Sequence, residues 1–305
     1  MKAWWEKERL EDEIVDCRTI ILSTAGCKWR RCKMCSYYLE ANPKANSETI
    51  LNEFREAYEK ADVVKIFTSG SFFDDREVDK EVRRKIYEFL EKEGVKKLVV
   101  ESRPEFITEE VVKEIQEAKI AIEVGIGVET SNDWIREKII NKGFTFQEFK
   151  RAASMLREAG SRVKAYLLLK PPLLSEEEAI KDAIQSVKDV ESYVDVISLN
   201  LMTVHKNTLV EKLWSKKLYR PPWLWSAVEV LKKSKIETIC DPVAGGKSRG
   251  PHNCYDCDPE FVEAIKSFSL TQDKSYLEEV ECDCEELWEV SLKGESLARL
   301  PVFVF

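Results

Sequence analysis

Apolar residues follow two different spacing patterns over the first two thirds of the chain. Short β-branched runs predict strands, and a segment with apolar residues three or four positions apart, typical of an amphipathic helix, follows each run. Ile50, Phe54 and Tyr58 show this helical spacing. The predicted strands cover residues 19–24, 63–68, 97–102, 122–128, 163–169 and 194–200.

Helix start and end signals agree with this alternation. The clearest are two capping boxes and one helix-ending glycine: Thr145 with Glu148, Ser175 with Glu178, and Gly94. Six successive strand–helix units predict an α/β fold with a parallel sheet, because each helix provides the crossover between strands. The pattern fits a partial barrel at least as well as an open doubly wound sheet. In both, the loops after the carboxyl ends of the strands form the active face.

The alternation stops near residue 220, at Pro221 and Pro222. The sequence therefore predicts a barrel domain with an amino-terminal lead-in over residues 1–218. Residues 219–305 are expected to form a cysteine-containing carboxyl-terminal extension that ends in a short apolar tail at 302–305.

Charge and hydropathy narrow the function classes. The net charge of −8 argues against a protein that binds a nucleic-acid backbone without a partner, because phosphate binding needs a basic face. No apolar run approaches the roughly 18–20 residues of a membrane span, and the first residues lack the pattern of a signal peptide. We expect a cytoplasmic protein without a membrane partner.

Three of the nine cysteines lie in the loop after the first predicted strand, at Cys27, Cys32 and Cys35. In a reducing compartment, clustered cysteines indicate metal ligands or catalytic thiols rather than disulfides. Three thiolates can hold three irons of a [4Fe–4S] cluster and leave the fourth iron open to a small molecule. The alternatives are a structural zinc loop, which needs a fourth ligand, and a chance grouping.

This loop resembles that of the radical S-adenosylmethionine superfamily. The resemblance implies a partial (βα)6 TIM-type barrel whose cysteines hold a [4Fe–4S] cluster, with S-adenosyl-L-methionine bound at the open iron. The family usually has three residues and then two between its cysteines, whereas this chain has four and then two. The family position before the third cysteine is Met34, whose backbone is expected near the adenine. No catalytic residue is assigned beyond the cluster ligands.

Other strand ends match the same superfamily. Ser69, Gly70 and Ser71 follow the second strand, where relatives bind the amino group of the cofactor. Glu101 begins a Glu-Ser-Arg-Pro-Glu segment similar to one in the Elongator catalytic subunit, and Glu129 follows the fourth strand. The resemblance implies cofactor contacts for both glutamates, although strand-end carboxylates are also commonly just solvated.

A second cysteine group lies in the extension. Cys240, Cys254 and Cys257 are the first choice for a second metal site, with Cys282, Cys284 and His252 as further candidate ligands. Such a set suits a structural zinc ion or an auxiliary iron–sulfur cluster. Free, partly buried thiols are the alternative.

A closer resemblance, to the archaeal radical proteins of archaeosine synthesis, rests on segments outside the cysteine loop. These are residues 18–24, 219–223, 241–247 and 250–254. It implies a lyase-type tRNA-modifying enzyme that cleaves the lysine C–N bond of a lysine-adducted 7-deazaguanine to give archaeosine. It also implies an archaeosine synthase partner that helps to hold the tRNA, and an electron donor. Lys28, Trp29, Arg30 and Arg31 are the candidate tRNA contacts, although a polar loop with one packed aromatic residue has the same composition.

Two other functions remain open at this point. The chain resembles other radical enzymes too, so a methylthiotransferase-like enzyme or one that acts on a free small molecule is an alternative. A non-catalytic iron–sulfur scaffold subunit of a tRNA-modifying complex is the second. That subunit would not cleave S-adenosylmethionine even with a reduced cluster.

Overall fold

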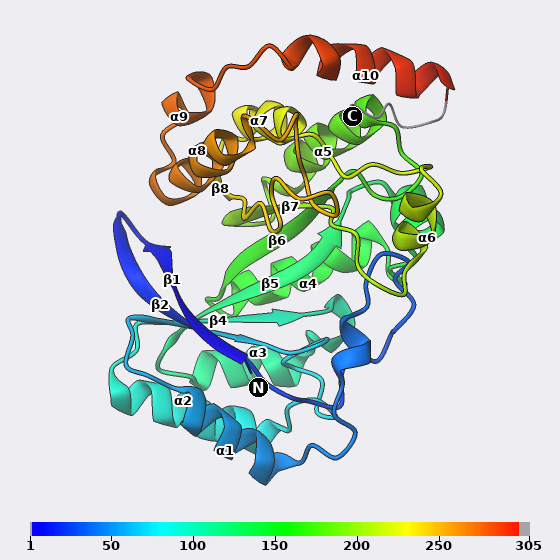
Figure 1. The fold of residues 1–305 in the computed structure, drawn as a ribbon. Coiled ribbons are helices and arrows are strands. Elements are labelled where there is room, and N and C mark those ends of the chain that lie inside the picture. Colours follow the sequence, from blue (N-terminus) through cyan, green and yellow to red (C-terminus); the bar gives the residue numbers. More distant parts are fainter. Residues whose placement is uncertain (1, 299–305) are drawn as a thin grey trace. The chain divides into compact units, whose positions relative to one another are not determined.

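The computed structural model describes residues 2–298, so the apolar tail expected at 302–305 lies outside the described residues. Its eight strands are hydrogen-bonded in chain order (Figure 1). They are β1 (Lys2–Leu10), β2 (Glu13–Ile21), β3 (Val63–Phe67), β4 (Lys97–Ser102), β5 (Ala121–Glu129), β6 (Arg162–Leu169), β7 (Val196–Leu201) and β8 (Glu237–Ile239). β1 pairs with β2 antiparallel, whereas β2 to β5 form parallel pairs, as do β7 and β8.

Helices alternate with these strands as the sequence predicts. They are α1 (Ser47–Ala57), α2 (Lys80–Glu93), α3 (Glu109–Glu117), α4 (Phe146–Glu158), α5 (Glu176–Val190), α6 (Leu209–Ser215), α7 (Leu224–Lys233), α8 (Asp258–Thr271), α9 (Ser275–Glu278) and α10 (Glu285–Ala298). Short 3₁₀ turns cover Tyr37–Glu40 and Pro104–Phe106, and a π-helical turn covers Ile135–Ile140. Within the described residues, no helix is long and apolar enough to cross a membrane.

The chain packs as two compact units. Among the described residues, the first contains 2–30, 37–127 and 147–164, and the second contains 31–36, 128–146 and 165–298. The segment from 219 belongs to the same unit as α5 and β7, and its extent as a separate domain stays a prediction.

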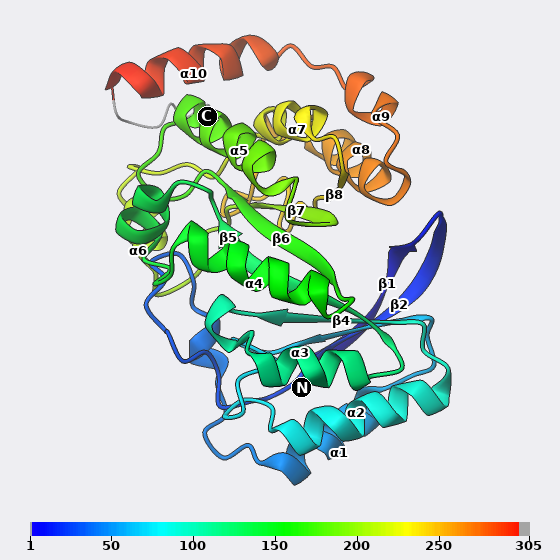
Figure 2. The same ribbon diagram turned by 180° about the vertical axis from the view of Figure 1, so that it is seen from behind.

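Helix ends in both units follow the capping signals of the sequence. Ser175 and Glu178 form a reciprocal capping box at α5, and Gly94 ends α2 in the left-handed conformation. At the start of α4 the Phe146 backbone N–H donates to Asp133 Oδ1 at 2.7 Å. α1 and α2 lie side by side in the first unit, and α10 lies along α5 in the second (Figures 1 and 2).

A network of buried ion pairs runs across the strands of the first unit. Lys65 binds Glu6 at 2.6 Å and also contacts Glu8, and Lys164 binds Glu123 at 2.7 Å. Lys97 lies between the two groups, 3.5 Å from Glu8 and 3.6 Å from Glu123. β1 was not expected from the sequence, because its inward positions at Glu6 and Glu8 carry carboxylates instead of apolar side chains. Those carboxylates face the lysines of neighbouring strands.

Acid is expected to destabilise the fold through Glu123. Burial alone would raise the pKa of this carboxyl, but Lys164 and Lys97 more than offset that and lower the pKa from 4.5 to about 2. The stability from the carboxylate is thus complete above about pH 4.5 and is lost as the pH falls toward 2. We expect this loss to be about 3 kcal/mol, measured by urea unfolding over that pH range.

Glu123→Gln is the comparison that isolates this effect. The variant should be less stable than the wild type near neutral pH, because it removes the carboxylate that binds Lys164 and leaves Lys97 with Glu8 alone. Its stability should also fall less steeply between pH 4.5 and 2. Parallel stability curves for the two proteins over this range would contradict the assignment.

Candidate functional site

The first cysteine loop begins directly after β2, at the carboxyl end of that strand. Leu22 continues the strand pairing by donating its backbone N–H to Phe67 O at 2.9 Å. Gly26 then turns the chain with φ 76°, and a Cβ on this residue would lie only 2.5 Å from Ala41 Cβ. The turn therefore requires glycine, both for its left-handed backbone and for the space.

Cys27 is held by close backbone packing in the first unit. A Cβ on Gly70 would lie 2.5 Å from Cys27 Cα and 2.1 Å from Glu77 Oε1. Arg30, at φ 54°, folds its guanidinium back onto the loop and donates to Cys27 O and Ala25 O, both at 2.8 Å. Cys27 is therefore a partly exposed residue whose backbone is held by Gly70 and by the side chain of Arg30.

Cys32 and Cys35 belong to the second unit. Cys35 donates its backbone N–H to Cys32 O at 3.2 Å, and both side chains pack against an apolar cluster that includes Met34 and Ile139. Between the cysteines, the Lys33 backbone donates to Ile140 O at 2.8 Å and accepts from Leu209 N at 3.0 Å. Neither cysteine forms a disulfide, and both are partly exposed.

The turn after β3 is tied to the first cysteine loop through a buried carboxyl that sequence reasoning missed. Glu77 accepts hydrogen bonds from Thr24 Oγ1 at 2.8 Å and from the Ser71 backbone at 2.7 Å, and burial raises its pKa. Ser71 is fully buried and its Oγ accepts from Arg103 N at 3.1 Å, whereas Ser69 and Gly70 are partly exposed. Glu77 lies in a polar segment, so the spacing of apolar residues in the sequence gave no sign that its side chain is buried.

The remaining strand-end glutamates differ in their surroundings. Glu101 is partly exposed, and its backbone oxygen accepts from Phe72 N at 2.8 Å. Glu129 ends β5, is 7% exposed and binds Lys142. Glu129 also has a φ of 66°, a left-handed backbone conformation that is unfavourable for residues other than glycine. Such strained residues cluster at active sites and ligand-binding sites.

The basic loop is less open than its composition suggests. Lys28, Arg30 and Arg31 are exposed, but the guanidinium of Arg30 is already bound to loop carbonyls. Trp29 is partly exposed, and the guanidinium of Arg103 lies over its ring, 5.4 Å from the centroid. A tRNA contact at this loop stays a prediction.

The structure regroups the second set of cysteines. Cys254, Cys257, Cys282 and Cys284 bring their sulfur atoms within 4.8 Å of one another. Cys240 does not belong to this group; it follows β8 and is buried, with its backbone N–H bound by Ser269 Oγ. His252 does not belong to it either, and its Nδ1 lies 2.8 Å from Gly250 O. The sequence analysis chose Cys240 over Cys282 and Cys284 because sequence spacing does not show which distant cysteines the fold brings together.

Comparison with known proteins assigns this arrangement to a class. The family described as the Radical SAM superfamily matches residues 21–184, which include the first cysteine loop and the ends of β2 to β6. The structure of the archaeal Methanocaldococcus infernus Elp3 is similar in fold, with a TM-score of 0.52 at 14% identity over 92% of this chain and 63% of that chain. These matches confirm the fold class expected from the sequence.

Two curated relatives narrow the assignment. The archaeosine synthase subunit beta of Methanosarcina acetivorans is 44% identical over 91% of this chain and 85% of its own length. That of Thermococcus kodakarensis is 44% identical over 95% of both chains. The chain belongs to the radical S-adenosylmethionine superfamily and, within it, to the family of the archaeosine synthase beta subunits.

The donor set fits the cofactors of this superfamily, a [4Fe–4S] cluster and S-adenosylmethionine. Three partly exposed cysteines that form no disulfide match the soft donors that bind iron in such clusters, and three ligands leave one iron available to a small molecule. The close packing of Gly70 against Cys27 fixes the backbone of one of these residues.

Gly70→Ala is expected to disturb this site. The added methyl group would overlap Cys27 Cα and Glu77 Oε1, so the cysteine loop must shift. We expect a loss of about 1–3 kcal/mol in the free energy of unfolding and reduced iron loading. Gly94→Ala is the matched control, since its Cβ would meet no atom within 4 Å; it should lose stability through its φ of 76° alone and keep its iron. Equal iron contents in both variants and the wild type would contradict the role of Gly70.

Proposed function

We propose that this protein is the radical-generating subunit of a tRNA-modifying enzyme that forms archaeosine. The observation that carries the proposal is the 44% identity to archaeosine synthase beta subunits, which extends over nine tenths of the chain. The loop of Cys27, Cys32 and Cys35 lies within the part matched by the Radical SAM superfamily and supports the same proposal.

In this proposal, Cys27, Cys32 and Cys35 hold the [4Fe–4S] cluster. When bound and reduced by an electron donor, the cluster with S-adenosylmethionine supplies a 5′-deoxyadenosyl radical able to remove an unactivated hydrogen atom. The Met34 backbone lies beside the adenine, and the turn at Ser69–Gly70–Ser71 binds the methionine end. Ser71 acts through its position in this turn, because its own N–H and hydroxyl are bound inside the protein.

Glu101 and Glu129 are the proposed carboxylate contacts to the cofactor. Glu129 is the better supported of the two, since its left-handed backbone and its ion pair with Lys142 hold the carboxylate in one position. Glu77 is a positioning residue: it joins the cysteine loop at Thr24 to the turn at Ser71.

The proposed substrate is tRNA whose 7-deazaguanine base carries a lysine adduct. A hydrogen atom is removed from the lysine part and leaves in 5′-deoxyadenosine. The carbon–nitrogen bond then breaks, its nitrogen stays on the base as part of the amidine of archaeosine, and the carbon chain of the lysine is released as an oxidised product. The name of the relatives, a beta subunit, supports a partner subunit that adds the lysine and helps to hold the tRNA. The net charge of −8 also supports a role for the partner subunit in tRNA binding, because a negatively charged chain does not attract a polyanion by itself. The reaction belongs to the reducing cytoplasm.

The test is product analysis of a defined tRNA. Anaerobically reconstituted protein, S-adenosylmethionine, a reductant and lysine-bearing tRNA should give archaeosine in a nucleoside digest, detected by mass spectrometry. A tRNA with unmodified 7-cyano-7-deazaguanine should give none. Cleavage of S-adenosylmethionine without archaeosine from the lysine-bearing tRNA would favour another radical enzyme over this proposal.

A further inference from the structure

The second cysteine group joins two segments far apart in the sequence. Cys254 and Cys257 lie just before α8, whereas Cys282 and Cys284 lie between α9 and α10. Cys254 Sγ is 3.6 Å from Cys257 Sγ and 3.8 Å from Cys282 Sγ, and Cys257 Sγ is 3.7 Å from Cys284 Sγ. All four sulfur atoms lie within 4.8 Å of one another.

These separations fit one metal ion. Four thiolates about 2.3 Å from a tetrahedral zinc ion have their sulfur atoms about 3.8 Å apart. A disulfide requires a sulfur separation of about 2.05 Å, far shorter than any measured here. In a [4Fe–4S] cluster each thiolate binds a different iron at a different corner, which spreads the sulfurs farther apart than around a single ion.

We propose that Cys254, Cys257, Cys282 and Cys284 bind one structural zinc ion in a closed site with four thiolate ligands. Binding releases the thiol protons to solvent and changes no oxidation state. Four protein ligands leave no open coordination position, which is the mark of a structural rather than a catalytic zinc site.

The surrounding residues are arranged to receive thiolates. Trp225 Nε1 points to Cys284 Sγ at 3.4 Å, and Asn253 Nδ2 points to Cys257 Sγ at 3.6 Å. Asn253 is itself fixed, because its side-chain oxygen accepts from Trp225 N at 3.2 Å and its backbone N–H donates to Asp258 at 2.7 Å. N–H donors of this kind offset the excess negative charge of four thiolates around a divalent ion and orient the ligands.

The zinc site has a structural purpose at α10. This helix lies along α5 (Figure 2), yet its two most buried side chains, Ser291 and Glu295, are polar. Of its apolar residues, Leu287, Val290 and Leu297 are 42%, 58% and 88% exposed, and Trp288 and Leu292 are only partly buried, so no large apolar side chain of the helix is fully buried. An ion bound by Cys282 and Cys284 would fix the chain immediately before Glu285, the first residue of the helix.

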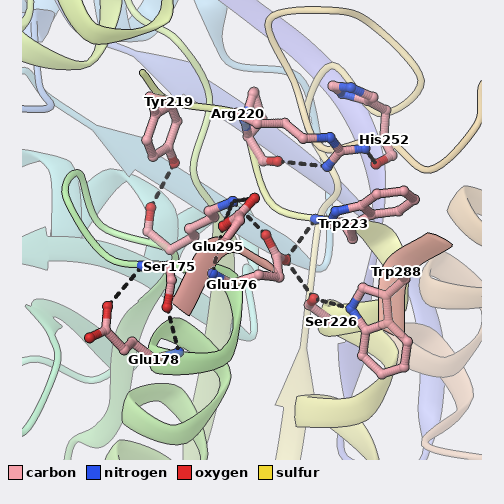
Figure 3. A network of polar contacts seen from close by, with 12 residues as sticks. Ser175, Glu176, Glu178, Tyr219, Arg220, Trp223, Ser226, His252, Trp288 and Glu295 are labelled. Atoms are coloured by element: carbon pink, nitrogen blue, oxygen red, sulfur yellow. Dashed lines mark hydrogen bonds and ion pairs between the residues drawn. The ribbon is translucent and has the colours of Figure 1, made fainter. Parts of the chain in front are cut away.

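Fixing that end positions a buried charge farther along the helix. Glu295 accepts from the Glu176 backbone at 2.8 Å and binds Lys170 at 3.1 Å, and Trp288 donates to Ser226 at 2.9 Å (Figure 3). These polar contacts require accurate placement of α10. We therefore expect the metal to stabilise the whole of this helix.

Metal analysis of the purified full-length protein tests the proposal. We expect about one zinc ion per chain in the wild type, and the same in a Cys27→Ala/Cys32→Ala/Cys35→Ala variant that has lost its iron. Cys282→Ser/Cys284→Ser should contain no zinc and should unfold at a lower temperature. Cys240→Ala is the matched control, a buried cysteine of the same region outside the group, and should keep its zinc.

A second measurement keeps the test valid if the double variant does not fold. Cobalt(II) loaded into the wild-type protein in place of zinc should give the intense visible absorption of a tetrahedral thiolate site, and a strong chelator should lower the melting temperature. Zinc-free wild-type protein whose four thiols all react with a thiol reagent in the folded state would overturn the proposal. Iron with inorganic sulfide retained by the triple Cys27, Cys32 and Cys35 variant would also overturn it.

Discussion

Replacement of Cys32 by alanine is expected to abolish the cleavage of S-adenosylmethionine, and Cys27→Ala and Cys35→Ala should do the same. Each variant removes one of the three thiolates proposed to hold the cluster, and two ligands would not retain it. Iron in the reconstituted protein should fall from about four atoms per chain to less than one, and 5′-deoxyadenosine should fall to background. Iron analysis and chromatography of the reaction mixture measure the two quantities.

Cys17→Ala is the matched control for this series. Cys17 lies in the first unit, as Cys27 does, but it is fully buried in β2. Burial raises the pKa of its thiol to about 12, so it is a poor metal ligand. The variant should keep its iron and form 5′-deoxyadenosine. Full iron content in Cys32→Ala, or its loss in Cys17→Ala, would contradict the ligand assignment.

Lys170→Met is expected to cause the largest loss of stability among single substitutions in the second unit. Lys170 is 1% exposed and binds two buried carboxylates, Glu176 at 2.6 Å and Glu295 at 3.1 Å. Burial and the neighbouring Glu176 already raise the pKa of Glu295. Without the lysine, negative charge would remain buried without a cation, at a cost of about 3–5 kcal/mol. Urea unfolding near neutral pH measures the change.

Lys181→Met provides the control for this substitution. Lys181 lies on α5, pairs with Glu177 at 2.6 Å and is 71% exposed, so its loss leaves no buried charge. We expect no measurable change in its unfolding curve. If Lys170→Met were as stable as Lys181→Met, the buried network in Figure 3 would have no part in holding α5 and α10 together.

The strand–helix pattern could be predicted because the core positions of most elements are apolar. Strand 97–102 has the expected bounds, and the strands expected at 63–68, 122–128 and 163–169 differ from β3, β5 and β6 by one residue at one or both ends. β1 was missed because its inward-facing positions, Glu6 and Glu8, are charged, and a period-two apolar pattern cannot reveal a strand whose inner face forms ion pairs. β8, with three residues, is too short to show any period.

The sites could be predicted where the ligands are close in sequence. Cys27, Cys32 and Cys35 fall within nine residues, so their grouping is visible without a structure. Cys254 and Cys257 were visible for the same reason, whereas Cys282 and Cys284 reach them only through the fold of the chain after α8. Glu77 was not found because its role depends on two loops, at Thr24 and Ser71, that the sequence does not place together.

The most direct test of the central claim is anaerobic reconstitution with iron and sulfide, followed by reduction in the presence of S-adenosylmethionine and measurement of 5′-deoxyadenosine. We predict that the wild-type protein forms 5′-deoxyadenosine and that Cys32→Ala does not. If fully loaded and reduced wild-type protein forms none, with lysine-bearing tRNA and the partner subunit present, the chain is not a radical enzyme. Cys27, Cys32 and Cys35 would then serve a structural iron–sulfur site in a scaffold subunit.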